Sequence, residues 1–189
     1  MVIPLEGNWD KGFAFDLHTE SSIHIGTDPF GHEQFETRRT QMGELLYQLK
    51  YRQRREVAKE IVDLLAERFK TLNTFDAIIP CPATKSRPWQ PVEEITMELG
   101  KRFGVAVINA LVKDTSSTQI KDIEDPAERE KLLLESIRIK DTHDFSGKKV
   151  LLVDDLYQSG STLSVATYVL KEQANAAMVC VLTMTKTRR

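Results

Sequence analysis

KVLLVDDLYQSGST, residues 149–162, predicts a buried strand that leads through two acids and a short loop into a helix. The four apolar residues 150–153 form the continuous run expected of a parallel strand that is covered on both faces. Asp154 and Asp155 follow at the carboxyl end of this strand, where open α/β sheets bind their ligands. The stretch therefore predicts a ligand site on an α/β sheet.

The loop after the two acids is suited to bind a phosphate group. Its members are Gln158, Ser159, Gly160, Ser161 and Thr162, and a helix is expected from Thr162 onward. The first N–H groups of a helix lack partners within the helix, and they attract anions. Gly160 lets the backbone approach such a group closely. An ordinary helix cap by Ser159 or Ser161 explains the hydroxyls alone, but it does not explain two adjacent acids ahead of the loop.

This segment resembles the motif with which type I phosphoribosyltransferases bind 5-phosphoribosyl 1-pyrophosphate (PRPP), with Ser159 in place of the usual Thr. The resemblance implies that Asp154 and Asp155 are catalytic, hold the ribose hydroxyls and orient Mg²⁺ through water. It also implies that residues 158–162 bind the 5′-phosphate. The reaction then moves the phosphoribosyl group to a nitrogenous base and releases pyrophosphate, through a transition state that resembles an oxocarbenium ion.

The family's pyrophosphate loop follows the first core strand. In this chain FDAIIPCP, residues 75–82, reads as that strand, and the loop after it supplies Thr84, Lys85, Ser86 and Arg87. The alternative is two solvated cations on a loop. A second polar loop, residues 113–125, is either a lid that closes over the site, with Lys113 and Lys121 as pyrophosphate contacts, or a plain linker.

Alternating helical and strand patterns from residue 75 onward predict an α/β fold with an open, mostly parallel sheet and helices on both faces. Strands are expected in VAVIN, SIRIK and AMVCVLTM as well, and helices over 41–70, from Pro91 to Gly104, and from Asp125. Residues 1–40 contain a predicted hairpin. By resemblance we assign 1–40 to a small hood-like segment over the strand ends and 41–189 to the phosphoribosyltransferase-like core.

Within the family, the chain is most similar to the ComF-like group. The matching segments are Leu49 to Arg52, the strand bracketed by Pro80 and Pro82, and Asp114-Thr115 with Gln119. Members of that group often carry an N-terminal cysteine zinc element, which this sequence lacks. A role in DNA uptake therefore stays an alternative, with the basic run of residues 50–55 as its physical support.

Composition limits the other classes. Lys and Arg number 26 against 28 acids, so the chain has no overall basic footprint for nucleic acid. Cys81 and Cys180 lie in apolar runs and are expected to be buried thiols rather than disulfide partners. No secretion signal or membrane-length apolar run occurs, so we expect a cytoplasmic protein without a membrane partner. A homodimer is expected only by family resemblance.

The acceptor is not named by any motif. In phosphoribosyltransferases that salvage 6-oxopurines, an Asp that acts as a base precedes the Thr-Gly pair, and Gln158 cannot take that proton. Candidates for stacking on a base are Trp9, Phe13, Phe15 and Tyr157, and for all but Tyr157 the alternative is a place in the core. The spacing of the N-terminal histidines predicts no metal site. A protein that binds PRPP or a nucleotide without turnover remains the main alternative to an enzyme.

Overall fold

Five strands form the central sheet of the computed structural model, which describes residues 2–83, 89–113, 135–141 and 143–188. Their order is β1-β2-β9-β8-β5, and every neighbouring pair except β1 and β2 is parallel. The strands of this sheet are β1 (Ile3–Pro4), β2 (Lys11–Leu17), β5 (Ala77–Pro80), β8 (Lys149–Tyr157) and β9 (Met178–Lys186). The predicted α/β class with a mostly parallel sheet is confirmed.

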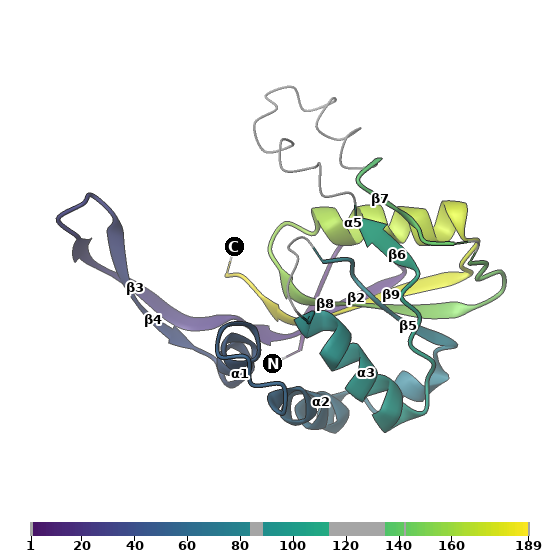
Figure 1. Cartoon of the computed structure of the whole chain (residues 1–189), viewed down its shortest axis with the longest axis horizontal. Coiled ribbons are helices and arrows are strands. Elements are labelled where there is room, and N and C mark those ends of the chain that lie inside the picture. The colour runs from purple at the N-terminus through teal and green to yellow at the C-terminus, as the bar shows by residue number, and fades with distance from the viewer. Residues whose placement is uncertain (1, 84–88, 114–134, 142, 189) are drawn as a thin grey trace.

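Helices cover both faces of the sheet (Figure 1). One face carries α1 (Gln41–Tyr51), α2 (Val57–Arg68) and α3 (Pro91–Phe103). The other face carries α5 (Ser161–Tyr168), which continues as a π-helical turn, η3 (Val169–Gln173). Among the described residues no helix is long and apolar enough to cross a membrane.

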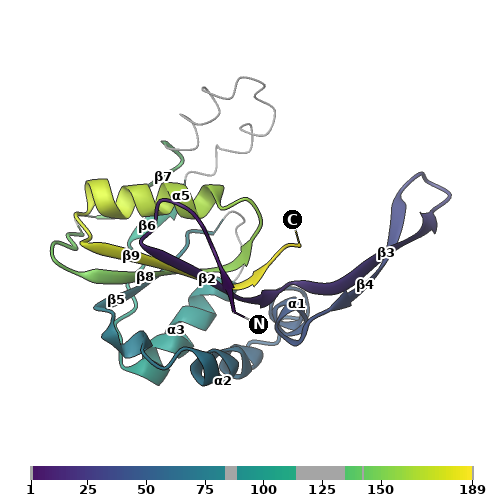
Figure 2. The same cartoon turned by 180° about the vertical axis from the view of Figure 1, so that it is seen from behind.

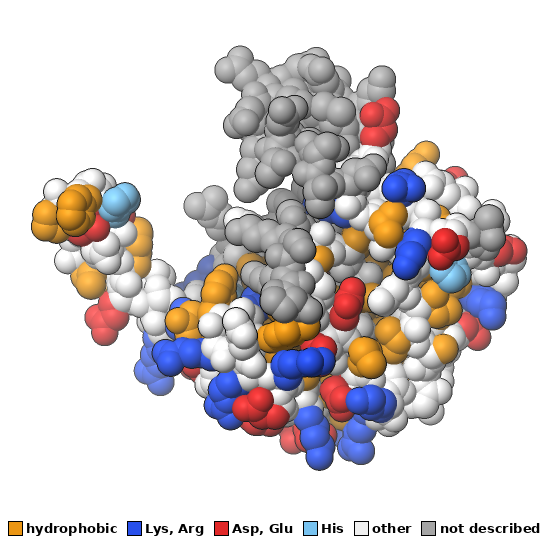
Figure 3. Space-filling view, viewed as in Figure 1, with side chains coloured by type: hydrophobic (Ala, Val, Ile, Leu, Met, Phe, Trp, Pro, Cys, Tyr) orange, Lys and Arg blue, Asp and Glu red, His pale blue; other side chains and the backbone are white. Residues whose placement is uncertain are grey.

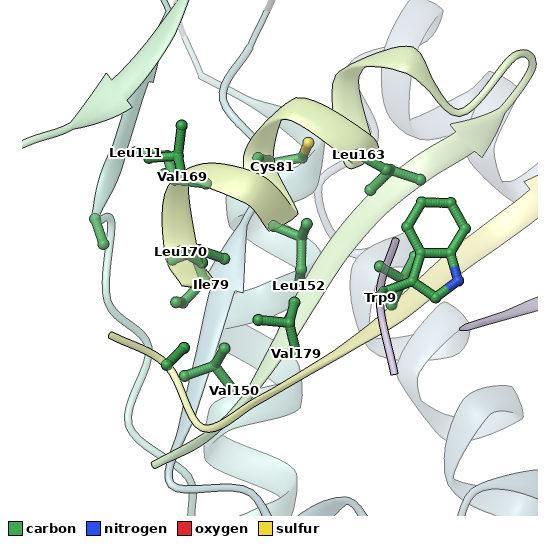
Figure 4. Packing of buried hydrophobic residues seen from close by; sticks show 14 of the residues in the cluster. Trp9, Ile79, Cys81, Leu111, Val150, Leu152, Leu163, Val169, Leu170 and Val179 are labelled. Carbon is green, nitrogen blue, oxygen red and sulfur yellow. The ribbon is translucent and has the colours of Figure 1, made fainter. Parts of the chain in front are cut away.

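Strand β8 divides the hydrophobic core because alternate side chains of a strand point to opposite faces. Val150 and Leu152 pack beneath α5 with Trp9, as Figure 4 shows. Leu151 and Val153 pack against α1 to α3 on the other face. All four β8 side chains are buried, so the apolar run at 150–153 serves two cores at once.

The N-terminal residues contribute to two different structures. Strands β1 and β2 join the central sheet, and β2 pairs with β9 near the other end of the chain. Residues after β2 form a hairpin from β3 (Thr19–Thr27) and β4 (Glu33–Arg39), further along the chain than the alternating stretch of residues 12–26 predicts, and it projects from the body as a ribbon (Figures 1 and 2). Figure 3 shows hydrophobic side chains at its far end, where Phe30 is 85% exposed. The division of the chain at residue 40 and the hood role stay predictions.

Four elements differ from the sequence prediction. The helical stretch 41–70 is two helices, because Gln53 takes a left-handed conformation (φ 54°) between them. VAVIN makes only an isolated parallel bridge, at Val107 to Ile78, before the chain turns at Ala110. SIRIK contains β7 (Ile137–Ile139), which pairs with β6 (Leu111–Lys113) outside the central sheet. Strand β8 runs past the two acids to Tyr157, because β9 continues to pair with it.

Helix α1 is held against the end of β2 by its first turn. The Thr40 hydroxyl caps the helix by accepting a hydrogen bond from Gly43 N at 3.1 Å, and it donates to the Leu17 carbonyl at 2.6 Å. Gly43 lies so close to the His18 backbone that a Cβ atom there would come within 2.1 Å of the His18 oxygen. The missing side chain of Gly43 therefore sets how near α1 lies to the sheet.

We expect Gly43→Ala to destabilise the protein by about 1–3 kcal/mol, the usual cost of overpacking. Within a helix the same change ordinarily stabilises by about 1 kcal/mol, so the contact with His18 reverses the sign. Chemical denaturation of the variant and of the exposed control Gln41→Ala measures both free energies of unfolding. A stabilised Gly43→Ala variant would show that α1 does not depend on this close approach.

Candidate functional site

A cavity of about 330 Å³ lies at the carboxyl ends of β5 and β8. Parallel strands bring these ends to one edge of the sheet, as the apolar-run-and-acids pattern predicts. Segments from five parts of the chain line the cavity: Lys50 of α1, residues 81–83 after β5, residues 90–93 at the start of α3, residues 154–157 of β8, and residues 158–163 at the start of α5.

Asp154 lines this cavity. Its side chain is partly buried, and one carboxylate oxygen accepts a hydrogen bond from the Asp155 N–H at 2.8 Å. Burial, and next the negative charge of Asp155, raise the pKa of Asp154 to about 7. Burial, reinforced by the charge of Asp154, also raises the pKa of the neighbouring Cys81 thiol well above its ordinary value. The carboxyl group of Asp154 therefore lines the cavity without a cation close enough to compensate for its burial.

Asp155 is paired with a lysine from the N-terminal half of the chain. Its Oδ2 atom lies 2.7 Å from Lys50 Nζ, and the two side chains are only 16% and 18% exposed. Partial burial makes such a pair stronger than one on the surface, where ion pairs contribute little. Lys50 of helix α1 therefore places a positive charge beside Asp155, at the carboxyl end of β8.

The start of α5 is open toward the cavity. Gly160 is the residue that precedes the helix, it has a positive φ of 78°, and no side chain caps the helix there. The hydroxyls of Ser159 and Ser161 lie 3.0 Å apart and bond to each other. The Ser161 N–H donates to the Ser159 hydroxyl at 3.4 Å. The helix has no side-chain cap, so the N–H groups that follow in its first turn remain available to an anion.

A histidine lies at the same edge of the sheet, at the end of β2, two strands away from β8. His18 follows β2, and its Nδ1 atom lies 3.1 Å from the hydroxyl of the buried Thr185. That hydroxyl donates in turn to the Asp155 carbonyl at 3.3 Å. Burial, and next the positive charges of Lys50 and Arg39, lower the pKa of His18, although Asp155 opposes this shift.

The structure brings part of the predicted site together. Asp154, Asp155 and residues 158–162 all line the one cavity. The predicted pyrophosphate residues Thr84, Lys85, Ser86 and Arg87 lie outside the described residues, and so do Lys121 and the helix expected from Asp125. Lys113 ends β6 and is close enough to Cys81 for its charge to act on that thiol.

The aromatic candidates lie in different parts of the molecule, and Phe13 and Phe15 are only partly buried. Tyr157 lines the cavity, and the buried Trp9 packs edge-on against it with ring centres 6.3 Å apart. Phe13 contacts Phe69 at the opposite end of β2. Tyr157 is therefore the aromatic side chain of the four that faces the cavity.

Lys50 and His18 were not predicted as members of the site. Lys50 was considered only as part of the basic run of residues 50–55, and the structure gives several members of that run acidic partners: Lys50 pairs with Asp155, Arg54 with Glu56, and Arg55 with Glu94. These pairings weaken the physical support for a nucleic-acid surface. A signal for Lys50 existed in the LKYR segment, but nothing local connects that segment with Asp155.

Metal-binding capacity at the site rests on Asp154 and Asp155. Among residues 2–83, 89–113, 135–141 and 143–188, no group of three or more His, Cys, Asp or Glu side chains could hold a metal ion. Two adjacent carboxylates suit Mg²⁺, which keeps several waters and takes few protein ligands when a substrate phosphate completes its shell.

Comparison with known proteins identifies a family that matches most of the chain. The model of the phosphoribosyl transferase domain family matches residues 48–189. A search of curated protein sequences found no match. Solved structures with a similar fold include an adenine phosphoribosyltransferase, which is 12% identical over 88% of this chain and 85% of that chain, with a TM-score of 0.48.

Two other solved structures with a similar fold are of phosphoribosyltransferases from Pyrococcus horikoshii and Aeropyrum pernix. The purine phosphoribosyltransferase of Pyrococcus horikoshii is 16% identical over 68% of this chain and 82% of its own, with a TM-score of 0.43. The orotate phosphoribosyltransferase of Aeropyrum pernix is 12% identical over 89% and 74%, also with a TM-score of 0.43. Likeness at this level carries no argument about the substrate.

The raised pKa of Asp154 predicts a stability that depends on pH. A carboxyl group with a higher pKa in the folded chain binds more protons when folded, so the free energy of unfolding falls as the pH rises from about 4 to about 7. Asp154→Asn removes this loss and keeps an oxygen to accept from Asp155 N–H. We expect the variant to be more stable than the parent at pH 8 by at least about 1 kcal/mol, or about 2–4 °C in Tm.

Thermal melts at pH 5 and pH 8 measure this difference, and the exposed helix acid Asp63 provides the control Asp63→Asn. The gap between Asp154→Asn and the parent should be larger at pH 8. Equal gaps at both pH values would mean that Asp154 is not destabilised by its surroundings.

Proposed function

Since the chain belongs to the phosphoribosyl transferase domain family, we propose that it binds PRPP with Mg²⁺ and transfers the phosphoribosyl group to a nitrogenous base, releasing pyrophosphate. The observation that carries the proposal is that two adjacent acids and an uncapped helix start line the same cavity. A ribose and its 5′-phosphate need such neighbours, because the sugar offers hydroxyl donors and the phosphate needs N–H groups.

Each part of the cavity has a proposed role. The carboxylates of Asp154 and Asp155 accept hydrogen bonds from the ribose hydroxyls and stabilise positive charge as it develops on the sugar. The backbone and hydroxyls of residues 158–162 hold the 5′-phosphate. The pyrophosphate site at Thr84 to Arg87 is proposed from the sequence alone, because these residues lie outside those described.

The donor set fits Mg²⁺. Asp154 is a carboxylate with a neighbouring like charge, a situation that a divalent cation relieves. Asp154 and Asp155 would hold the ion through water, and the bound ion would supply charge neutralisation for the departing pyrophosphate.

In the absence of substrate, Lys50 occupies the Asp155 carboxylate and so competes with the ribose hydroxyls for it. Its ammonium group bonds to the carboxylate of Asp155 that we assign to the ribose. Substrate binding must therefore lengthen or share this ion pair. In return, the ion pair with Lys50 holds the Asp155 carboxylate in place before the substrate arrives.

A first test is calorimetric titration of PRPP with and without Mg²⁺. We expect Mg²⁺-dependent binding that weakens by about 10–100-fold in Asp155→Asn, because a charge-assisted hydrogen bond becomes a neutral one. The variant Asp63→Asn makes the same chemical change on an exposed face of α2 and should bind as the parent does. Equal affinity of parent and Asp155→Asn would sink the assignment of the ribose site.

A second test uses two glycines with the same backbone strain. Gly160 and Gly147 have φ values of 78° and 72°, so alanine is disfavoured equally at both. A Cβ atom at Gly160 would come within 2.9 Å of the Tyr157 ring, whereas nothing lies within 4 Å at Gly147. We expect Gly160→Ala to lower PRPP affinity at least about tenfold and Gly147→Ala to leave it unchanged. Similar affinities in both variants would separate this loop from the 5′-phosphate.

Pyrophosphate release separates an enzyme from a binding protein. A panel of nitrogenous bases offered with Mg²⁺ and PRPP should yield pyrophosphate if the chain is a transferase. PRPP binding without release from any base would favour the alternative of a PRPP or nucleotide sensor. Membership of the ComF-like group, a cytoplasmic location and a homodimer belong to the same proposal and await direct measurement.

A further inference from the structure

We infer that the open edge of β4, on the projecting ribbon, is the surface through which two copies of this chain pair, strand against strand, about a twofold axis. This edge would locate the contact of the homodimer proposed above, and pairing through it does not require PRPP. Three features carry the inference: the isolation of the ribbon, the difference between its two edges, and the order of charges along β4.

The ribbon is isolated from both hydrophobic cores. In the described part of the chain, β3 and β4 form a sheet of two strands, and neither core includes any of their side chains. A hairpin of two strands is marginally stable by itself in water, and more strands or a covering layer are usually needed. Four large hydrophobic side chains of the ribbon are exposed: Ile23, Ile25, Phe30 and Phe35. A further strand would therefore stabilise the ribbon.

The two edges of the ribbon differ in their ability to accept a strand. Both irregularities in the pairing place an extra residue on β3, after Thr19 and after His24, and such bulges hinder the addition of another strand. The Arg188 side chain also donates hydrogen bonds to the Thr19 and Glu20 carbonyls at the base of β3. Strand β4 has neither a bulge nor a proline in its seven residues. The edge of β4 is therefore the one on which another strand can pair.

Charges along β4 change from acidic to basic. Glu33 and Glu36 lie in the first part of the strand, and Arg38 and Arg39 end it. Antiparallel pairing of two β4 strands sets the acidic part of each against the basic end of the other, whereas parallel pairing would set like charges side by side. Antiparallel pairing of identical strands is also what a twofold axis produces. The partner that matches this order of charges is therefore β4 of a second copy.

The charges also select a register. A twofold axis through two antiparallel copies of one strand sets one residue opposite itself. With Thr37 at the axis, Glu36 of each copy lies opposite Arg38 of the other, which is a favourable cross-strand pair. With Glu36 at the axis, two like charges would meet. Within the described part of the chain Glu36 has no ion pair, and Arg38 has an exposed one with Glu20, at 2.6 Å, which costs little to exchange.

The first test is analytical ultracentrifugation of the full chain over a series of concentrations. We expect a monomer–dimer equilibrium whose dissociation constant rises at least about tenfold in Glu36→Arg, because both contacts with Arg38 become repulsive. Glu67→Arg makes the same change on an exposed face of α2 and should leave the dissociation constant unchanged. A parent that is monomeric at every concentration, or a dimer that Glu36→Arg does not weaken, would overturn the inference.

Exchange of the two charges separates a lost contact from a damaged ribbon. Arg38→Glu should weaken the dimer as Glu36→Arg does, because each variant places like charges at both contacts. An equal mixture of the two variants restores opposite charges at both contacts, so the mixed dimer should form with an affinity close to that of the parent. A mixture that stays monomeric, although circular dichroism shows both variants folded, would contradict the proposed pairing.

Cross-linking tests the register. Directly opposite residues of antiparallel strands have Cα atoms about 4.5–5.5 Å apart, a separation that a disulfide can span. Mild oxidation should link Thr37→Cys into a covalent dimer and leave Ser22→Cys, the facing position on β3, monomeric. Cys81 and Cys180 are buried and should add little background. Any result in which Ser22→Cys links at least as readily as Thr37→Cys would rule out the β4 contact.

The two proposals fail in different ways. A parent that dimerises through β4 and does not bind PRPP keeps this contact and overturns the proposed function. A parent that binds PRPP and stays monomeric, or whose dimer is insensitive to both charge reversals, keeps the proposed function and overturns the contact. A ribbon that instead attaches the monomer to phosphatidylcholine vesicles would have the same meaning.

Discussion

Parallel pairing of β8 with β5 on one side and β9 on the other is the constraint on which the rest of the molecule depends. The register aligns Val150 to Val153 with buried residues of both neighbours, so each of these side chains has a core to enter. Moving this strand by one residue would exchange the two faces and bring Asp154 into the position of Val153. The same register therefore builds the two cores and delivers Asp154 and Asp155 to the edge of the sheet.

The site works against the stability of the fold. Burial disfavours the ionised form of Asp154 and the neighbouring charge of Asp155 repels it, so the pKa of Asp154 is raised. Lys50 offsets part of this repulsion through Asp155. A purely structural sheet would have apolar or singly charged residues here, so this conflict supports the ligand-binding role that we propose for the two acids.

Local signals in the sequence predicted the elements that carry them. The start of α3 at Pro91 and its end at the left-handed Gly104 follow from proline at the first turn and glycine after the last. The strand at 150–153 and the loop at 158–162 follow from an apolar run and a motif. The break between α1 and α2 was not predicted, because the apolar period continues across it and the left-handed Gln53 has no glycine to mark it.

Local signals in the sequence did not predict the contacts between segments that lie far apart along the chain. Lys50 meets Asp155, and His18 meets Thr185, only because α1 and β2 lie beside β8 and β9. The short alternating stretch of β2 suggests a strand but does not indicate its neighbour, and its parallel partner is β9, more than 150 residues away in the sequence. The contribution of Lys50 and His18 to this edge of the sheet therefore follows from the topology of the fold, and no sequence motif predicts it.

That pairing also has a consequence for how the protein is made. Strand β2 ends at Leu17, and its partner begins at Met178. At about 5–20 residues per second, a ribosome needs on the order of 10–30 s to make the chain between them. Throughout that time the nascent β2 has no parallel partner, and the edge that will hold His18 does not exist. This part of the sheet edge is thus completed only after β9 has been synthesised and has paired with β2.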